Sequence, residues 1–398
     1  MDQYSDVKSR CDAARDAARS VAGLSADERG ALILKIADRI MSQERVILDA
    51  NECDVELAEG QISPYMLGRL RLDKGRLELM CNRLTALAAA PDPLGSRRGG
   101  VRGDNLEVTA RRAPLGAVAF IYQCRPQLAA LAPAACIKTG NAALLCPDAA
   151  SSATDRAIVS AVQSVMRNEG YPPESLWYME PQLHVSAESL CTMAGGIDLA
   201  VLRDGLLPER EGLSVPVIRS GGGVSHIYVD QACKVVSAAR VTAKTLYSSR
   251  REHCLVALVH KDAAEEFFEA LRLALQPNLP EVRGCPVTRE YLSDAIPASR
   301  GDWTAAHDTS ANVLTARVVE SVEEAAVHIN VYGTAGVDAI MTCDDYRAAL
   351  FERLVNSRVV CVNTPPTRDV LSDSVSVALG IDGLSTLTRK KILVSGVA

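Results

Sequence analysis

Apolar residues recur three to four positions apart along the first 90 residues, most clearly at 31–40 and 67–87. This spacing places an apolar stripe along one side of a helix, so the segment is expected to be a helical entry into the domain that follows. Ser25 stands three positions before Glu28, a pair typical of a helix N-terminus with a capping box. The prolines and glycine between 90 and 95 are expected to end this helical part.

Farther along the chain, short apolar runs alternate with longer amphipathic segments. We expect an exposed strand at 106–111, followed by buried strands at 116–121, 141–145, 198–202 and 216–218. Helices are expected near 127–138, 151–169 and 184–194. Such alternation predicts a parallel sheet covered by helices on both faces.

A second α/β part is expected between 231 and 362. It begins with a helix at 231–246, a strand at 255–259 and a helix at 262–275, and it ends with a strand at 358–362. The segments 96–113 and 381–397 alternate like exposed strands. The fold class is therefore α/β, with domains at 1–230 and 231–362 and a tail, 363–398, that returns to the first domain.

Composition narrows the class of partner. The chain has 398 residues, 48% of them hydrophobic and 23% charged, as in a soluble globular protein. A net charge of −6 argues against nucleic acid or a membrane surface as partner. No run approaches the ~18 apolar residues of a membrane helix, and the N-terminus is polar and acidic, so we expect a cytoplasmic protein. The twelve cysteines are scattered singly, which favours reduced thiols and argues against a metal site.

Several separated segments carry motifs of one known family. They are 51–54 (NECD), 112–126 (RAPLGAVAFIYQCRP), 136–142 (CIKTGNA), 215–230 (VPVIRSGGGVSHIYVD), 243–262 (AKTLYSSRREHCLVALVHKD) and 328–333 (HINVYG). Together they resemble the γ-glutamyl phosphate reductase family of the aldehyde dehydrogenase superfamily. The resemblance implies that 1–230 is a dinucleotide-binding domain, that 231–362 is a catalytic domain, and that the strand extension joins a homo-oligomer, a dimer or tetramer.

The resemblance also implies a reaction, the NADPH-dependent reduction of γ-glutamyl phosphate to the semialdehyde in proline biosynthesis. A cysteine thiolate attacks the acyl phosphate, and an amide donor holds the oxyanion. The implied cofactor-binding residues are Lys138, Gly140, Asn141, Asp148, Arg203 and Gly205.

The chain departs from the family pattern at the nucleophile. An ungapped match puts Arg251 at the family's cysteine, and a guanidinium that stays protonated cannot attack a carbonyl. Cys254 lies three residues on, beside His253, and is the candidate replacement. Gln127 replaces the asparagine expected to donate to the oxyanion, and its extra methylene would displace that donor.

The cofactor turns depart as well. Asp148 follows the strand 141–145, where it would repel an adenosine 2′-phosphate but could accept hydrogen bonds from the ribose of NAD. Asp204 places another carboxylate in the second turn, before Gly205.

Two hypotheses follow from these departures. The preferred one is a degenerate relative that keeps the fold but has lost the reaction, with the cofactor, NADPH, NADH or none, left open. It would act as a regulatory subunit for a protein partner or would bind an anion through Arg250, Arg251 and His226, although His226 is more typical of a structural histidine. The alternative is an active NAD(P)H-dependent reductase with Cys254 as its nucleophile.

Overall fold

The computed structural model describes residues 3–94, 97–103, 106–181, 187–193, 195–203, 212–220, 223–247, 253–304, 313–366, 374–379, 381 and 383–396. The chain divides into two compact units. Unit 1 consists of Met1–Ser220 and Leu371–Ala398, and unit 2 consists of Gly221–Val370. None of the helices in the described ranges combines the length and hydropathy of a membrane span.

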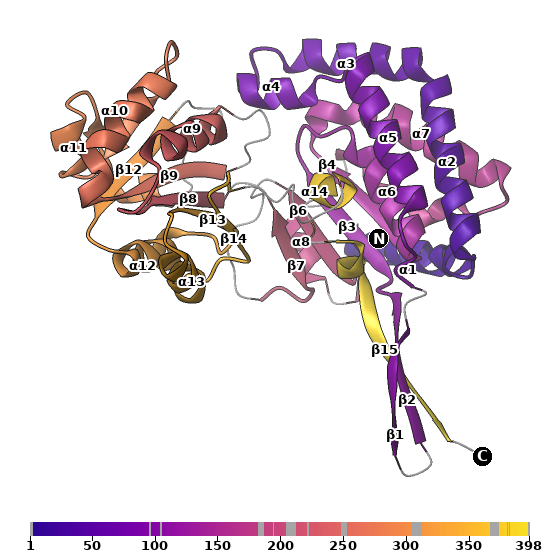
Figure 1. The fold of residues 1–398 in the computed structure, drawn as a ribbon. Helices are drawn as coiled ribbons and strands as arrows, with labels where there is room; N and C mark the ends of the chain where they lie inside the picture. Colours follow the sequence, from indigo (N-terminus) through magenta and orange to yellow (C-terminus); the bar gives the residue numbers. More distant parts are fainter. Residues whose placement is uncertain are drawn as a thin grey trace. The chain divides into compact units, whose positions relative to one another are not determined.

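Unit 1 opens with the expected helices, drawn in indigo and violet in Figure 1. They are α1 (Gln3–Ala22), α2 (Ala26–Ser42), α3 (Glu44–Ala58), α4 (Pro64–Leu70) and α5 (Lys74–Ala89). The predicted capping box is present at α2. Ser25 Oγ accepts from the Glu28 backbone N–H at 3.2 Å, and Glu28 Oε2 accepts from the Ser25 N–H at 2.8 Å.

A parallel five-stranded sheet forms the centre of unit 1. Its strands are β3 (Ala117–Tyr122), β4 (Ala142–Pro147), β5 (Leu176–Tyr178), β6 (Leu199–Arg203) and β7 (Val217–Ser220), in the spatial order β5-β4-β3-β6-β7. Helices α6 (Leu128–Thr139) and α7 (Ser152–Asn168) pack on one face with α2 and α5. Helices α1 and α8 (Ala187–Thr192) pack on the other. The strand order reverses at β3, which makes the carboxyl ends of β3 and β6 a switch point of the kind that binds ligands.

A three-stranded antiparallel sheet extends from unit 1 (Figure 1). It consists of β1 (Arg97–Gly103), β2 (Leu106–Pro114) and β15 (Thr388–Gly396), with β2 in the middle. The short helix α14 (Ser374–Leu379) precedes β15. Ile392, Leu393 and Val394 of β15 are 58%, 55% and 55% exposed. The expected strand extension and returning tail are therefore present.

Unit 2 contains a parallel seven-stranded sheet. Its strands are β8 (Gly223–Val229), β9 (His253–His260), β10 (Glu281–Gly284), β11 (Ile296–Pro297), β12 (Val313–Val319), β13 (Val337–Met341) and β14 (Val359–Val362), in the order β11-β10-β12-β9-β8-β13-β14. Helices α9 (Val235–Leu246) and α10 (Ala264–Ala274) cover one face. Helices α12 (Val322–Tyr332) and α13 (Asp345–Leu354) cover the other, and α11 (Thr288–Tyr291) follows β10.

The observed boundaries differ from the expected ones. Unit 2 begins before β8, whereas the sequence pattern suggested a first domain extending to 230. All seven residues of β8 are buried, and the strand pairs with β9 and β13, so it belongs to the second sheet. Its polar residues Ser225 and His226 interrupt the apolar run by which a buried strand is identified. The return to unit 1 is at 371, rather than at 363.

Candidate functional site

The carboxyl edge of the unit 1 sheet carries Asp148, directly after β4. Asp148 Oδ1 accepts from the Cys124 N–H at 3.4 Å, and Oδ2 lies 3.5 Å from the Cys124 thiol. Cys124 is fully buried and has a left-handed backbone with φ of 47°. Burial raises the pKa of Asp148, while its hydrogen bonds to Cys124 oppose that rise. The carboxyl group therefore fixes the turn after β3, and its remaining lone pairs can accept from a ligand.

The other candidates at this edge are Gln127 and Arg203. Gln127 is half-buried and precedes α6 without a side-chain hydrogen bond to that helix. Arg203 ends β6, is 1% exposed and pairs in register with Ser220 of β7. Gly205, with Asp204, lies outside the described residues.

Lys138, Gly140 and Asn141 lie at the opposite edge of the same sheet. Lys138 Nζ donates to the Ala88 carbonyl at 2.8 Å. Gly140 ends α6 with φ of 70°. Asn141 Oδ1 accepts from the Gly116 N–H at 2.9 Å, and its amide donates to the Leu387 carbonyl at 2.7 Å.

These three residues therefore join α5, α6, β3 and the segment before β15. The six residues of β4 separate Asn141 from Asp148, a span of roughly 20 Å. The structure thus does not bring the two groups of candidate cofactor residues together.

His226 lies inside unit 2, in the middle of β8, with no exposed surface. Its Nδ1 is 2.8 Å from Asp338 Oδ1, and its backbone N–H donates to the same oxygen at 2.7 Å. Its ring contacts His328 edge to face, with the ring centres 5.5 Å apart. This burial favours the structural interpretation of His226 over a role in anion binding.

Cys254 is the second residue of β9, and its backbone pairs with Val224 of β8. It thus lies at the amino edge of the unit 2 sheet, one residue after the segment 248–252. Arg250 and Arg251 fall in that segment, outside the described residues.

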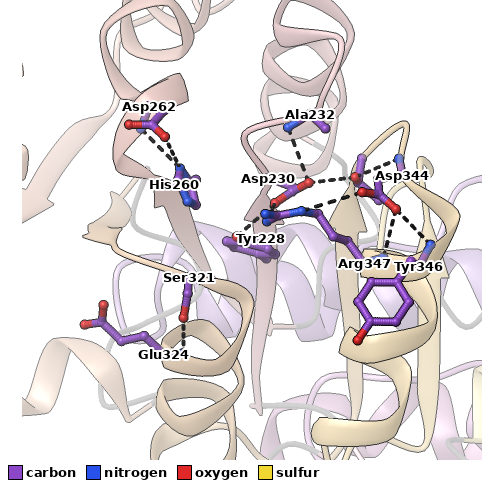
Figure 2. A network of polar contacts seen from close by, with 11 residues as sticks. Tyr228, Asp230, Ala232, His260, Asp262, Ser321, Glu324, Asp344, Tyr346 and Arg347 are labelled. Carbon is purple, nitrogen blue, oxygen red and sulfur yellow. Dashed lines mark hydrogen bonds and ion pairs between the residues drawn. The ribbon is translucent and has the colours of Figure 1, made fainter.

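The carboxyl edge of the unit 2 sheet holds a polar network (Figure 2). The Asp230 carboxylate is fully buried and accepts from Arg347 Nη1 at 2.8 Å, from the Tyr228 hydroxyl at 3.1 Å and from Thr342 Oγ1 at 2.7 Å. Nearby, His260 Nδ1 accepts from the Asp262 N–H at 3.2 Å. These bonds hold the turns that follow β8, β9 and β13.

Two buried acids in unit 1 were not among the sequence candidates. Asp155, in the first turn of α7, accepts from Ser151 Oγ at 2.9 Å and from the Tyr122 hydroxyl at 3.2 Å, and burial raises its pKa well above the ordinary range. Asp54 of α3 accepts from the Thr154 N–H and hydroxyl. An acid early in α7 resembles an ordinary helix start, so the sequence carried no signal for Asp155. The NxxD spacing was the signal for Asp54.

Comparisons with known proteins show which proteins the chain is similar to. No family model matches it. A γ-glutamyl phosphate reductase of Carboxydothermus hydrogenoformans is 32% identical over 382 residues, which cover 94% of this chain and 91% of that protein. One of Xanthomonas campestris pv. campestris is 34% identical over 388 residues, covering 96% and 92%.

Solved structures agree with these relatives. The γ-glutamyl phosphate reductase of Thermotoga maritima superposes with a TM-score of 0.85 at 26% identity, over 99% of both chains. The glyceraldehyde-3-phosphate dehydrogenase GapN of Methanocaldococcus jannaschii, solved with NADP, has a TM-score of 0.71 at 15% identity over 99% of this chain and 94% of that one, a likeness of fold alone. A NAD-dependent benzaldehyde dehydrogenase of Corynebacterium glutamicum has a TM-score of 0.65 at 16% identity over 99% of this chain and 89% of that one, again a likeness of fold alone. The chain has the aldehyde dehydrogenase fold and belongs to the γ-glutamyl phosphate reductase family.

Proposed function

We propose that this protein is an NAD(P)H-dependent acyl-phosphate reductase that acts on γ-glutamyl phosphate with Cys254 as its nucleophile. The observation that carries the proposal is its relation to reductases over more than nine-tenths of the chain, across both units. This relation favours an active enzyme over the loss of activity that the departures in sequence suggested.

The first step of the reaction is a nucleophilic attack by the thiol. The Cys254 thiolate attacks the carbonyl carbon of the acyl phosphate, and phosphate leaves with the bonding electron pair, so that a thioester forms. When bound, the reduced nicotinamide supplies the hydride that converts the thioester to an aldehyde and frees the thiolate. Cys254 follows Arg250 and Arg251 closely in the sequence, and nearby cations lower the pKa of a thiol and hold a phosphate.

The residues at the carboxyl edge of unit 1 fit a dinucleotide. Its sheet has the strand order of dinucleotide-binding domains, and Asp148 follows the strand next to the first one, where such domains place an acid on the ribose. A carboxylate accepts from a ribose hydroxyl and repels a 2′-phosphate. We therefore expect the protein to bind NADH more tightly than NADPH. Asp148→Asn should reduce the difference between these two affinities, measured by calorimetric titration with each dinucleotide. Equal affinities for NADH and NADPH in the unaltered protein would contradict this role of Asp148.

A turnover assay tests the reductase. In the reverse direction, glutamate-5-semialdehyde, phosphate and oxidised dinucleotide should yield reduced dinucleotide, detected by its absorbance. Cys254→Ser should lower the rate about 10³-fold or more, because a hydroxyl is a much weaker nucleophile than a thiolate. Cys53→Ser, at an exposed cysteine of α3, is the matched control and should leave the rate unchanged.

One observation favours a second function, a dinucleotide- or anion-binding protein without turnover. Arg251 stands at the position of the family's cysteine. If this second function is correct, the unaltered protein will bind dinucleotide in the calorimeter but show no turnover, and Arg251→Cys will create activity. If Cys254 is the nucleophile, Arg251→Cys will not be needed for activity.

A further inference from the structure

Two cysteines lie on adjoining turns of unit 2. Cys233 is on the turn between β8 and α9, and Cys343 is on the turn between β13 and α13. The Cys343 backbone N–H donates to the Ala232 carbonyl at 2.7 Å, which ties one turn to the other. Figure 2 shows Ala232 and Asp344, the chain neighbours of the two cysteines, in the contacts around Asp230.

That hydrogen bond limits the distance between the two cysteines. In a trans peptide the Ala232 oxygen lies about 2.8 Å from Cys233 Cα, by standard bond lengths. With the N···O distance of 2.7 Å, Cys343 Cα lies about 3.7 Å from the same oxygen. The two Cα atoms are therefore at most about 6.5 Å apart, inside the range of about 4.4–6.8 Å that disulfides span.

The two turns are held in place by the network described above. The Cys233 N–H donates to the Asp230 carbonyl at 3.2 Å. The Asp230 carboxylate accepts from Thr342 Oγ1 at 2.7 Å, and the Asp344 N–H donates to that same hydroxyl oxygen at 3.1 Å. Each cysteine thus stands next to residues that are already fixed, so the fold itself holds the two Cα atoms within the distance that a disulfide spans.

The two thiols differ in access. Cys343 is exposed, and Cys233 is half-buried. Burial, then the charge of Asp230, raises the pKa of Cys233 to about 11, and Cys343 is among the groups whose charge adds to that rise. An oxidant in solution would therefore meet Cys343 first, and Cys233 would react second, as the resolving thiol.

We propose that Cys233 and Cys343 form a reversible disulfide by exchange with a low-molecular-weight disulfide such as oxidised glutathione. The Cys343 thiolate attacks one glutathione sulfur, and the S–S bond breaks to release one glutathione thiolate. Cys233 then loses its proton and attacks Cys343 Sγ, which releases the second glutathione. Two protein thiols are oxidised and one glutathione disulfide is reduced to two thiols. This exchange uses neither Cys254 nor the dinucleotide.

The test is a titration of the reduced full-length protein in glutathione buffers of rising disulfide fraction. Samples are quenched with acid, alkylated and digested without reductant for mass spectrometry. We expect a linked pair of peptides that contain Cys233 and Cys343, lighter than the two reduced peptides by two hydrogens, about 2 Da, and separated by dithiothreitol. Glutathione attached to Cys343 without any linked pair, at every ratio, would overturn the proposal.

Two variants and one internal measure complete the design. Cys343→Ser should abolish the linked pair, and Cys53→Ser, at the other cysteine that is exposed among the described residues, should preserve it. In the unaltered protein, alkylation should show free Cys233 and free Cys343 disappearing one to one as oxidation proceeds. Loss of the Cys343 thiol with no equal loss at Cys233 would refute the disulfide, whether or not the variants fold.

Discussion

Asp54→Ala is expected to destabilise unit 1 more than most surface changes would. The Asp54 carboxylate is 5% exposed and comes from α3, yet it accepts three hydrogen bonds at the start of α7. The donors are the Ala153 N–H at 3.1 Å, the Thr154 N–H at 2.8 Å and the Thr154 hydroxyl at 2.6 Å. Alanine leaves these three donors without that acceptor, in a place where Thr154 has no exposed surface.

The expected magnitude follows from those contacts. A hydrogen bond to a charged group contributes about 1.5–3 kcal/mol, and loss of a helix cap costs about 0.5–2 kcal/mol. The three bonds share one carboxylate and are not additive, so we expect a loss of about 3 kcal/mol in the free energy of unfolding, about 150-fold in the equilibrium constant. Asp54→Asn keeps one acceptor oxygen and should lose about half as much.

Urea unfolding followed by fluorescence measures this loss in unit 1 alone. The chain has two tryptophans, Trp177 in unit 1 and Trp303 in unit 2, so a Trp303→Phe background leaves Trp177 as the reporter. Asp49→Ala, on the same helix but with a 68% exposed side chain, controls for helix propensity and should change stability by about 0.5 kcal/mol or less. Equal losses for Asp54→Ala and Asp49→Ala would refute the reasoning.

Three other predictions concern the two units and the strand extension. Burial holds the pKa of His328 at about 3, below its unfolded value of about 6.5. As the pH falls from 6.5 towards 3, protonation of His328 in the unfolded state should lower the free energy of unfolding of unit 2 by about 1.4 kcal/mol per pH unit, and this contribution of His328 does not change above pH 6.5. Urea midpoints at several pH values check this, and His328→Gln should flatten the dependence in that range. Gly140→Ala should lower the free energy of unfolding by about 3 kcal/mol, because the φ of Gly140 is 70° and the new Cβ would lie 2.9 Å from the Pro114 ring. Gly170 has a φ of 77° but open space around it, so Gly170→Ala should lower it by about 1 kcal/mol in the same assay, and equal losses would contradict the close contact. Ile392→Asp on exposed β15 should lower the mass measured by light scattering if this strand joins subunits, and an unchanged mass would exclude it from the subunit contact.

The fold followed from the sequence wherever one physical pattern dominated. The helical period of the first 90 residues and the Ser25–Glu28 pair predicted α2 and its cap, and the alternation after Pro114 predicted the first sheet. Several strands were given no place in the sequence, and two of them show different reasons. β5 has three residues, too few to show a period. β8 carries a buried histidine, His226, whose partner, Asp338, is more than a hundred positions away.

The candidate site was less predictable, because one motif can serve packing or binding. Lys138, Gly140 and Asn141 appeared beside a cofactor motif in the sequence, but their side chains and backbone join elements at the amino edge of the sheet. The distance along β4 between these residues and Asp148 favours a role in packing over a role in binding the cofactor.

The pairing of β15 with β2 has a consequence for the synthesis of the chain. β2 lies at 106–114, and its partner strand, at 388–396, is synthesised only after the whole of unit 2. Unit 2 is one continuous segment and can fold while translation continues. Unit 1 cannot complete its folding until β15 has been synthesised. A premature stop before β15 would leave one edge of β2 unpaired. Such truncated products should aggregate through that edge even though their second unit is intact.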